Sequence, residues 1–187
     1  MEPAEAAKKL LSQVGSGATV SEFRGESTVT LAADKLVDAL TFCRDELGFD
    51  MLMDLCSVDN SGEDPRFVVV YELYSIAKGC HLRVKTTCTE DDAEVPTVSA
   101  IWPTANWHER EVYDMMGIKF IEHPDLRRIL MWEGYPYYPL RKEFPLAGKE
   151  SKVEEVAFTE PAPLAGGPFV TASGAGDSDT REPRARN

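Results

Sequence analysis

The stretch at residues 66–88 reads RFVVVYELYSIAKGCHLRVKTTC and decides the fold class. Apolar side chains occupy alternate positions in both of its halves: Phe67, Val69, Tyr71 and Leu73, then Leu82 and Val84. A period of two predicts strands with one buried face and one wet face. The connection at 77–79 is too short for a crossover helix. We therefore expect a hairpin with strands at 66–74 and 80–88.

The elements outside this hairpin complete an α+β pattern. A third strand is expected at 50–58, joined to the hairpin through the turn-rich residues 60–65, and another at 27–31. Apolar residues spaced three and four apart predict two helices, over 3–13 and over 33–47, the second closed by Gly48 as its C-cap. The short connections favour an antiparallel meander over crossover units. The expected architecture is a two-layer α+β domain, a mostly antiparallel sheet with helices on one face, followed by an extended C-terminal arm.

Length and composition point to one globular domain. The chain has 187 residues, of which 43% are hydrophobic and 28% charged, ordinary proportions for a folded protein. No apolar run approaches the roughly 18 residues that cross a bilayer, and residues 1–11 carry acids and lysines where a signal peptide is apolar. The four cysteines show no metal-site or redox spacing, so free thiols in a reducing cytosol are expected.

The charge is acidic and unevenly spread. The chain has 20 basic and 32 acidic side chains, a net charge of −12. The first hundred residues hold nine basic and eighteen acidic side chains, whereas residues 101–146 are nearly balanced, with six and seven. Nucleic acid is an unfavourable partner, because binding a polyanion needs clustered cations. We expect residues 101–146 to provide the interaction surface.

Four segments follow from these patterns. The prolines of the run Tyr135-Pro136-Tyr137-Tyr138-Pro139 exclude a helix there. Residues 147–187 hold too little apolar surface to offset the cost of ordering them, unless they lie along a partner. The predicted divisions are an N-terminal helix and linker at 1–19, an α+β domain at 20–133, an extended Pro/Tyr-rich partner-binding segment at 134–146 and a low-order tail at 147–187.

Residues 106–117 form the most informative segment and predict a short helix. Asn106 is the expected N-cap, Glu109 the partner in a capping box, and Gly117 the end. Arg110 and Asp114 are spaced as an i, i+4 pair. Both Glu111 and Asp114 lie toward the negative end of the helix dipole, so they need cations nearby.

The required cations are expected from the next segment. Pro124 fits the first position of a second short helix, and Arg127 and Arg128 point away from its apolar stripe. We expect Arg127 or Arg128 to meet Glu109, Glu111 or Asp114 in a partly buried carboxylate–guanidinium network. A metal or acid–base site built from these carboxylates with His108 and His123 is the less favoured alternative, since their spacing fits one helix face only weakly.

These residues carry a family resemblance. The pattern Glu109-Arg110-Glu111-x-x-Asp114-Met115-Met116, followed by His123, Arg127, Ile129 and Leu130, resembles the signature of one subunit family of respiratory NADH-quinone oxidoreductase, complex I. Its mitochondrial members are called the iron–sulfur protein 3 subunit. The run Pro139-Leu140-Arg141-Lys142-Glu143-Phe144-Pro145 is similar to a second motif of that family. The resemblance covers about residues 20–146. The loop at 134–142 departs from the family, being longer and more aromatic.

The resemblance implies a cofactor-free subunit of the peripheral arm, with the iron–sulfur clusters and the flavin held by partner subunits. Its partners would be the quinone-site subunit and the terminal iron–sulfur subunit. Membrane contact would come only through the complex, at the cytoplasmic side of the inner membrane. Equivalent subunits of ferredoxin-linked or hydrogenase-type complexes share the signature, so that alternative stays open. The rival classes are an autonomous metal-dependent enzyme using the acidic helix, and an acidic adaptor unrelated to respiration.

The aromatic and basic residues near the C-terminus have two readings each. Burial against a partner is favoured for Tyr135, Tyr137 and Tyr138, because they have no obvious core of their own chain to join; the alternative is a locally packed loop. Arg141 and Lys142 either bind acidic groups of a neighbouring subunit or form a solvated charge pair. The three tryptophans are equally compatible with core and interface positions.

Overall fold

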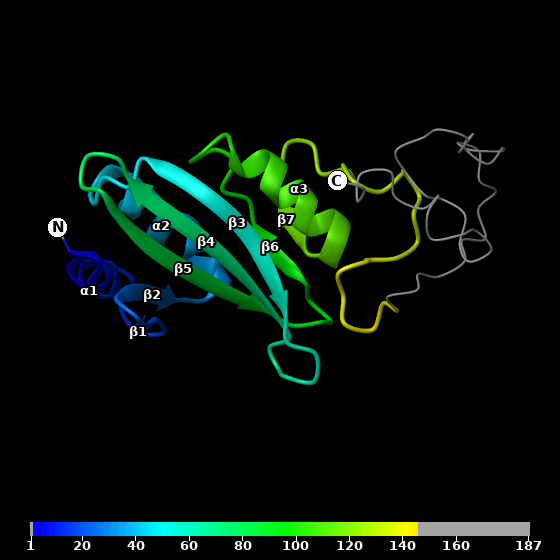
Figure 1. Ribbon diagram of the computed structural model, residues 1–187, viewed down its shortest axis with the longest axis horizontal. Helices are drawn as coiled ribbons and strands as arrows, with labels where there is room; N and C mark the ends of the chain where they lie inside the picture. The colour runs from blue at the N-terminus through cyan, green and yellow to red at the C-terminus, as the bar shows by residue number, and fades with distance from the viewer. Residues whose placement is uncertain (1, 146–187) are drawn as a thin grey trace, which may run out of the picture. The chain divides into compact units, whose positions relative to one another are not determined.

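The structure is a computed structural model that describes residues 2–145. Its elements in chain order are α1 (Pro3–Val14), β1 (Thr19–Phe23), β2 (Glu26–Thr30), the 3₁₀ helix η1 (Ala33–Lys35), α2 (Leu36–Asp45), β3 (Met51–Asp59), β4 (Phe67–Ser75), β5 (Cys80–Cys88), β6 (Glu94–Pro96), α3 (Ala105–Met116) and β7 (Lys119–Ile121) (Figure 1). The predicted α+β class is confirmed. The tail predicted at 147–187 lies outside the described residues.

The main sheet has the strand order β1-β2-β5-β4-β3. The predicted meander is confirmed for β3, β4 and β5, whose antiparallel register places Tyr71 opposite both Leu55 and Val84. The expectation of no crossover unit is wrong. β2 pairs with β5 in parallel, so β2, α2 and β3 form a crossover in which β2 and β3 run in the same direction. A helical connection can return the chain to the starting edge of the sheet, which a tight turn cannot do.

The core lies between the helices and one face of this sheet. Leu10 of α1 and Leu36 and Leu40 of α2 are fully buried, as are Tyr71 and Leu82 of the central strands. Figure 1 shows α2 behind the sheet, while α3 lies beside β3. Full burial of each such side chain contributes about 1.5–3 kcal/mol. The described part of the main sheet therefore has helices on one face only, as the alternation predicts.

A second, two-stranded sheet flanks α3. β6 and β7 pair in parallel, with Val95 opposite Phe120, and both of these side chains are buried. The strands come directly before and after the α3 region in the chain, so they hold both ends of that segment. Within residues 2–145 no helix has the length and apolar character needed to span a membrane.

The structure corrects two helix predictions. α3 begins at Ala105 with Thr104 as N-cap and no capping side chain, so the predicted cap at Asn106 is wrong. Its end at Gly117 is confirmed, and that residue has a left-handed φ of 77°. No helix forms around Pro124, because residues 122–131 are turns and irregular chain. The predicted closure of α2 is partly right: the helix stops at Asp45, and Gly48 takes the left-handed φ of 69° shortly afterwards.

Candidate functional site

Asp114, in the last turn of α3, organises the residues that follow the helix. Its side chain is fully buried. Its Oδ2 atom accepts hydrogen bonds from the backbone N–H groups of Ile129, Leu130 and Met131 at 3.0, 2.7 and 2.8 Å. Three successive N–H groups are thus directed at one carboxylate. They cannot make i→i−4 bonds at the same time, which is why the helix predicted here does not form.

The guanidinium of Arg128 completes the cage around Asp114. Arg128 Nη1 lies 2.6 Å from Asp114 Oδ1 and 3.0 Å from the backbone oxygen of the same residue. Burial by itself raises the pKa of Asp114, but the three N–H donors and Arg128 together outweigh it, so the pKa falls below its usual value. The predicted carboxylate–guanidinium contact is confirmed for this pair.

Arginine and aromatic side chains alternate in a stack that begins at Arg128. Its guanidinium lies 5.8 Å from the ring centre of Tyr135 and 5.1 Å from that of Tyr138. The guanidinium of Arg141 lies 4.6 Å from the ring centre of Tyr138 and 5.1 Å from that of Phe67. Arg66 lies 5.0 Å from Phe67. These distances allow cation–π attraction at each step, so the stack ties residues 128–141 to β4.

The tyrosines therefore join a cluster of their own chain. Tyr135, Tyr137 and Tyr138 are all half-buried, and Tyr135 makes edge contacts with Trp132 and Tyr137 at ring-centre distances of 5.4 and 5.7 Å. The expectation that they lack intramolecular neighbours is wrong, because their rings pack against one another and against arginines of the same chain. Burial against a partner stays a prediction for their exposed edges.

A second caged carboxylate, Asp59, holds the segment from the other side. Arg66 forms a bidentate pair with it, Nε to Oδ1 and Nη2 to Oδ2, both at 2.8 Å. The backbone N–H of Lys142 also donates to Asp59 Oδ2 at 2.8 Å. Hydrogen bonding from Arg66 is the main reason that the pKa of Asp59 lies below its usual value. Glu90 and Glu143 make further ion pairs with Arg66.

The end of α3 is the third attachment point. The backbone N–H of Leu140 donates to the carbonyl of Met115 at 3.1 Å, and Arg141 Nε donates to the carbonyl of Met116 at 2.7 Å. These carbonyls have no partner within the helix, so the segment satisfies them. A Cβ atom on Gly117 would lie 2.6 Å from the ring of Tyr138. Glycine is thus required here both for its backbone angle and for this close approach.

Glu109 and His123 form a separate buried pair. Glu109 accepts hydrogen bonds from the backbone N–H of Val98 at 2.7 Å and from the hydroxyl of Thr97 at 2.5 Å, so no capping box forms. Burial raises the pKa of Glu109 to about 7, although both donors oppose the shift. The Nε2 atom of His123 lies 3.7 Å from Glu109, and its Nδ1 atom accepts from the N–H of Asp125 at 3.0 Å.

The remaining predicted residues do not join this network. Arg127 pairs with Asp125 at 2.9 Å on the surface. Arg110 lies over the ring of Trp107 at 4.9 Å and donates to the backbone oxygen of Arg127 at 3.1 Å. Within residues 2–145 no ion pair joins Arg110 to Asp114, so that expected i, i+4 pair is wrong. The backbone N–H of Lys142 is used, but its side chain is exposed.

Neither Asp59 nor Arg66 was identified from the sequence. They stand at opposite ends of the turn between β3 and β4, where charged residues are ordinarily solvated. The signal that could have found them is a pair of opposite charges flanking a hairpin loop whose adjoining strands are apolar. Burial of that pair depends on residues 140–143, which come much later in the chain, so local pattern alone gives little warning.

The described residues do not converge on a metal site. Across residues 2–145 no group of three His, Cys, Asp or Glu side chains is placed to hold one ion. Both oxygens of Asp114 are occupied by protein donors, Glu109 is buried with Thr97 and Val98, and Glu111 is exposed. The convergence that an enzyme built on the acidic helix requires is therefore not present in this part of the chain.

The segment instead presents apolar side chains to solvent. Leu130 is 57% exposed, Trp132 45% and Leu140 56%, and Trp107 in the first turn of α3 is exposed as well. Trp102 by contrast is buried, so the three tryptophans divide between core and surface. Large aromatic and aliphatic side chains on a rigid backbone are typical of the centres of protein interfaces. We call residues 129–143, with the exposed side chains of Leu130, Trp132 and Leu140, the docking segment.

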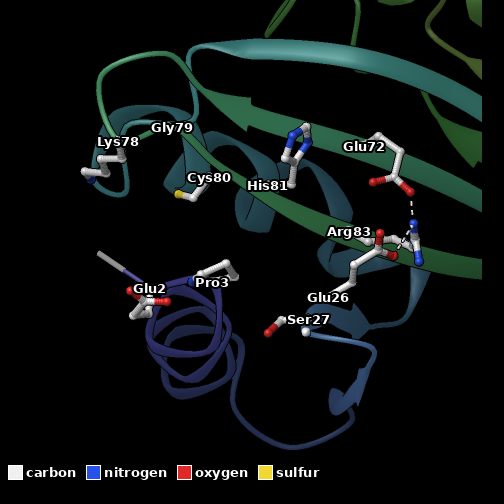
Figure 2. Close-up of a pocket in the computed structure, with 11 residues that line it drawn as sticks. Glu2, Pro3, Glu26, Ser27, Glu72, Lys78, Gly79, Cys80, His81 and Arg83 are labelled. Atoms are coloured by element: carbon white, nitrogen blue, oxygen red, sulfur yellow. Dashed lines mark hydrogen bonds and ion pairs between the residues drawn. The ribbon is translucent and has the colours of Figure 1, made fainter.

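The largest cavities lie elsewhere, and one of them is polar. A cavity of about 500 Å³ lies between the start of α1 and the turn that joins β4 to β5 (Figure 2). Figure 2 shows Arg83 reaching Glu72 and Glu26, and the second of these pairs measures 3.0 Å. These charges largely neutralise one another, which leaves the cavity poorly suited to chemistry. The docking segment is the better candidate site.

The fold and the docking segment define a class of protein: a small acidic α+β domain that carries a pre-ordered contact surface suited to a larger assembly. The chain belongs to the family described as the respiratory-chain NADH dehydrogenase 30 kDa subunit, which matches residues 29–150. The resemblance seen in the sequence is thereby confirmed.

Relatives and solved structures agree with this assignment. The C-type subunit of NADH-quinone oxidoreductase from Geobacter sulfurreducens is 49% identical over 70% of this chain and 82% of its own length. A subunit of the same type from Rhizobium meliloti is 46% identical over 70% and 72%. The trypsin-resistant fragment of Nqo5 is 30% identical, with a TM-score of 0.61 over 67% of this chain and all of that fragment. A chain of the archaeal membrane-bound sulfane sulfur reductase is 27% identical, with a TM-score of 0.67 over 78% and 87%.

Proposed function

We propose that this chain is a structural and assembly subunit of a proton-translocating NADH-quinone oxidoreductase and that it performs no redox chemistry itself. It docks onto the quinone-site subunit and the terminal iron–sulfur subunit, which hold their own groups, as the flavin subunit does. It reaches the cytoplasmic side of the inner membrane only as part of that complex. Family membership and the names of the relatives support this role.

One observation carries the proposal. The docking segment exposes Leu130, Trp132 and Leu140, yet its backbone is held by Asp114, by Asp59 and by the last carbonyls of α3. Such a surface costs little ordering entropy when a partner binds, because the backbone is already fixed. Exposed apolar side chains on a rigid frame have a cost in water, which burial in an assembly removes.

A second candidate has its own support. The chain of the sulfane sulfur reductase complex matches more of this protein than the Nqo5 fragment does, at a higher TM-score. The equivalent role in a ferredoxin-linked or hydrogenase-type complex therefore fits the same fold. The electron-input subunits that accompany the chain distinguish the two, since only one kind of complex carries an NADH-oxidising flavin subunit.

The test is purification of the tagged full-length chain in mild detergent. The expected result is a complex with quinone-site and iron–sulfur subunits that oxidises NADH with quinone, while the chain alone has no turnover. Trp132→Asp should reduce recovery of the partners, because it places a charge in the contact surface. Phe23→Asp is the matched control, since Phe23 is an exposed aromatic of β1 outside the docking segment. Recovery of a chain without partners but with its own activity would refute the proposal.

A further inference from the structure

A small cavity lies between β3 and α3, next to the docking segment. It measures about 220 Å³, and its walls include Leu55, Val112, Met115 and Leu140. A water molecule takes about 30 Å³ in the liquid, so the cavity has room for one large side chain. Leu140 belongs both to this wall and to the exposed apolar side chains of the docking segment. The cavity is therefore continuous with the docking segment.

Two carboxylates stand at the same cavity. Asp54 of β3 and Glu111 of α3 line it, and both side chains are exposed. Their influence is visible at Cys56, another lining residue: burial raises the pKa of its thiol, and the negative charges of Asp54, Glu72 and Glu111 raise it further. The mouth of an apolar cavity thus carries negative charge.

These carboxylates have little compensation from their own chain. The arginines that the sequence places near Glu111 are committed elsewhere: Arg127 to Asp125, Arg128 to Asp114 and Arg110 to the Trp107 ring. Among residues 2–145 no ion pair or hydrogen bond reaches the side chain of Glu111. Asp54 has His108 Nδ1 at 3.5 Å, a cation only when protonated. A neighbouring positive charge would therefore gain from both carboxylates.

We infer that this cavity receives one apolar side chain of a neighbouring subunit, with a lysine or arginine of the same partner segment placed against Glu111 and Asp54. The inference rests on the proposed function, since it takes the neighbour to be a subunit of the assembled complex. An apolar anchor in a pocket with a cation at its rim combines two recurrent features of interfaces. The cation fixes the register of the partner segment, and the anchor supplies the buried area.

The test uses the complex purified through a tagged partner subunit and measures how much of this chain remains after washes of rising NaCl concentration. Glu111→Lys places a positive charge opposite the partner cation. It should weaken retention about tenfold at low salt, and the difference should shrink as salt screens the charges. Asp38→Lys is the matched control, since Asp38 is an exposed carboxylate on α2.

A second variant tests the cavity without changing charge. Ser57 lines the cavity, so Ser57→Phe should fill it and weaken retention at every salt concentration. Ser21→Phe on the exposed strand β1 is its control. Circular dichroism of each purified full-length chain checks that the variants fold, and a misfolded variant is replaced by Glu111→Gln or Ser57→Leu at the same position.

The outcomes separate the inference from the proposed function. Normal retention of either Glu111→Lys or Ser57→Phe would overturn the inference, because it needs both the carboxylate and the cavity. If Trp132→Asp is lost from the complex while both of these variants are retained, the docking role stands and the inference falls alone. If the wild-type chain never associates with the complex, the proposed function itself fails. Crosslinks from position 57 to a second copy of this chain would also overturn the inference.

Discussion

Asp114→Asn is the substitution that tests the cage most directly. Asparagine keeps the shape but removes the charge, so Arg128 becomes a buried cation without its carboxylate, and the three N–H groups lose a charged acceptor. Breaking a buried ion pair by removing one partner costs about 3–5 kcal/mol. We take about 3 kcal/mol, because Arg128 keeps the backbone oxygens of residue 114 and Tyr137 as acceptors.

The loss should appear first as local opening of the docking segment. The core between α1, α2 and the main sheet does not depend on Asp114, and stability is not uniform across a protein. A change of about 3 kcal/mol corresponds to roughly hundredfold faster exchange through local opening, at about 1.4 kcal/mol per tenfold. We therefore expect hydrogen–deuterium exchange of the amides of Ile129, Leu130 and Met131 to rise by about that factor, with little change at β4.

Asp125→Asn is the matched control, because Asp125 pairs with Arg127 on the surface. Exposed pairs contribute about 0–1 kcal/mol, so exchange at the same three amides should change by less than about fivefold. The reasoning fails if Asp114→Asn and Asp125→Asn give the same exchange rates at Ile129, Leu130 and Met131. It also fails if β4 loses protection as much as the docking segment does.

Three further substitutions test the rest of the site. Gly117→Ala should lower the free energy of unfolding by at least about 1–2 kcal/mol, the cost of a left-handed residue with a Cβ, because that Cβ also meets the Tyr138 ring; an unchanged urea midpoint would refute this. Asp59→Asn should cost about 3 kcal/mol in the same urea titration, since Arg66 keeps only its glutamate partners, and a loss under about 1 kcal/mol would contradict it. Glu109 has a folded-state pKa raised to about 7, so its protonated form favours folding: the benefit is complete below the unfolded pKa of about 4.3 and is lost as pH rises toward about 7, by up to roughly 3 kcal/mol. Glu109→Gln should flatten the fall in stability between those pH values, and a pH profile parallel to that of the wild type would count against this assignment.

The pH dependence of the two caged aspartates has the opposite sign. The pKa values of Asp59 and Asp114 are both lowered in the folded chain. Their contribution to stability is therefore present above the unfolded Asp pKa of about 3.9 and is lost as pH falls below it. Acid should thus release the docking segment, whereas protonation of Glu109 at mildly acidic pH stabilises the core around it.

Local sequence patterns predicted the parts of the fold that depend on local rules. Alternating apolar residues placed β3, β4 and β5 to within about one residue at each end, because the side-chain period of a strand is two whatever its neighbours are. Gly117 was predicted as the end of α3, since a left-handed residue after a helix favours glycine. The charge complementarity between Asp114 and Arg128 was also visible, as a need for cations near the end of that helix.

Tertiary structure decided what each charge contacts. Asp114 is surrounded by backbone N–H groups from fifteen to seventeen residues away, and this contact removes the helix that Pro124, Leu126 and Ile129 suggest. Glu109 has a good capping-box position, yet its carboxylate is taken by Thr97 and Val98. A local preference of about 1 kcal/mol for a cap or a short helix is overridden when several hydrogen bonds to a buried charge compete with it.

The amino-acid sequence by itself determined the α+β class, the family and the register of the central hairpin, because these follow from periodicity and from a short run of characteristic residues. Only the folded chain decided that β2 runs parallel to β5, that Asp59 and Arg66 are buried, and that the tyrosines stack on Arg128 and Arg141. The free energy of each of these contacts depends on the burial that the whole fold provides, which no local pattern in the chain reveals.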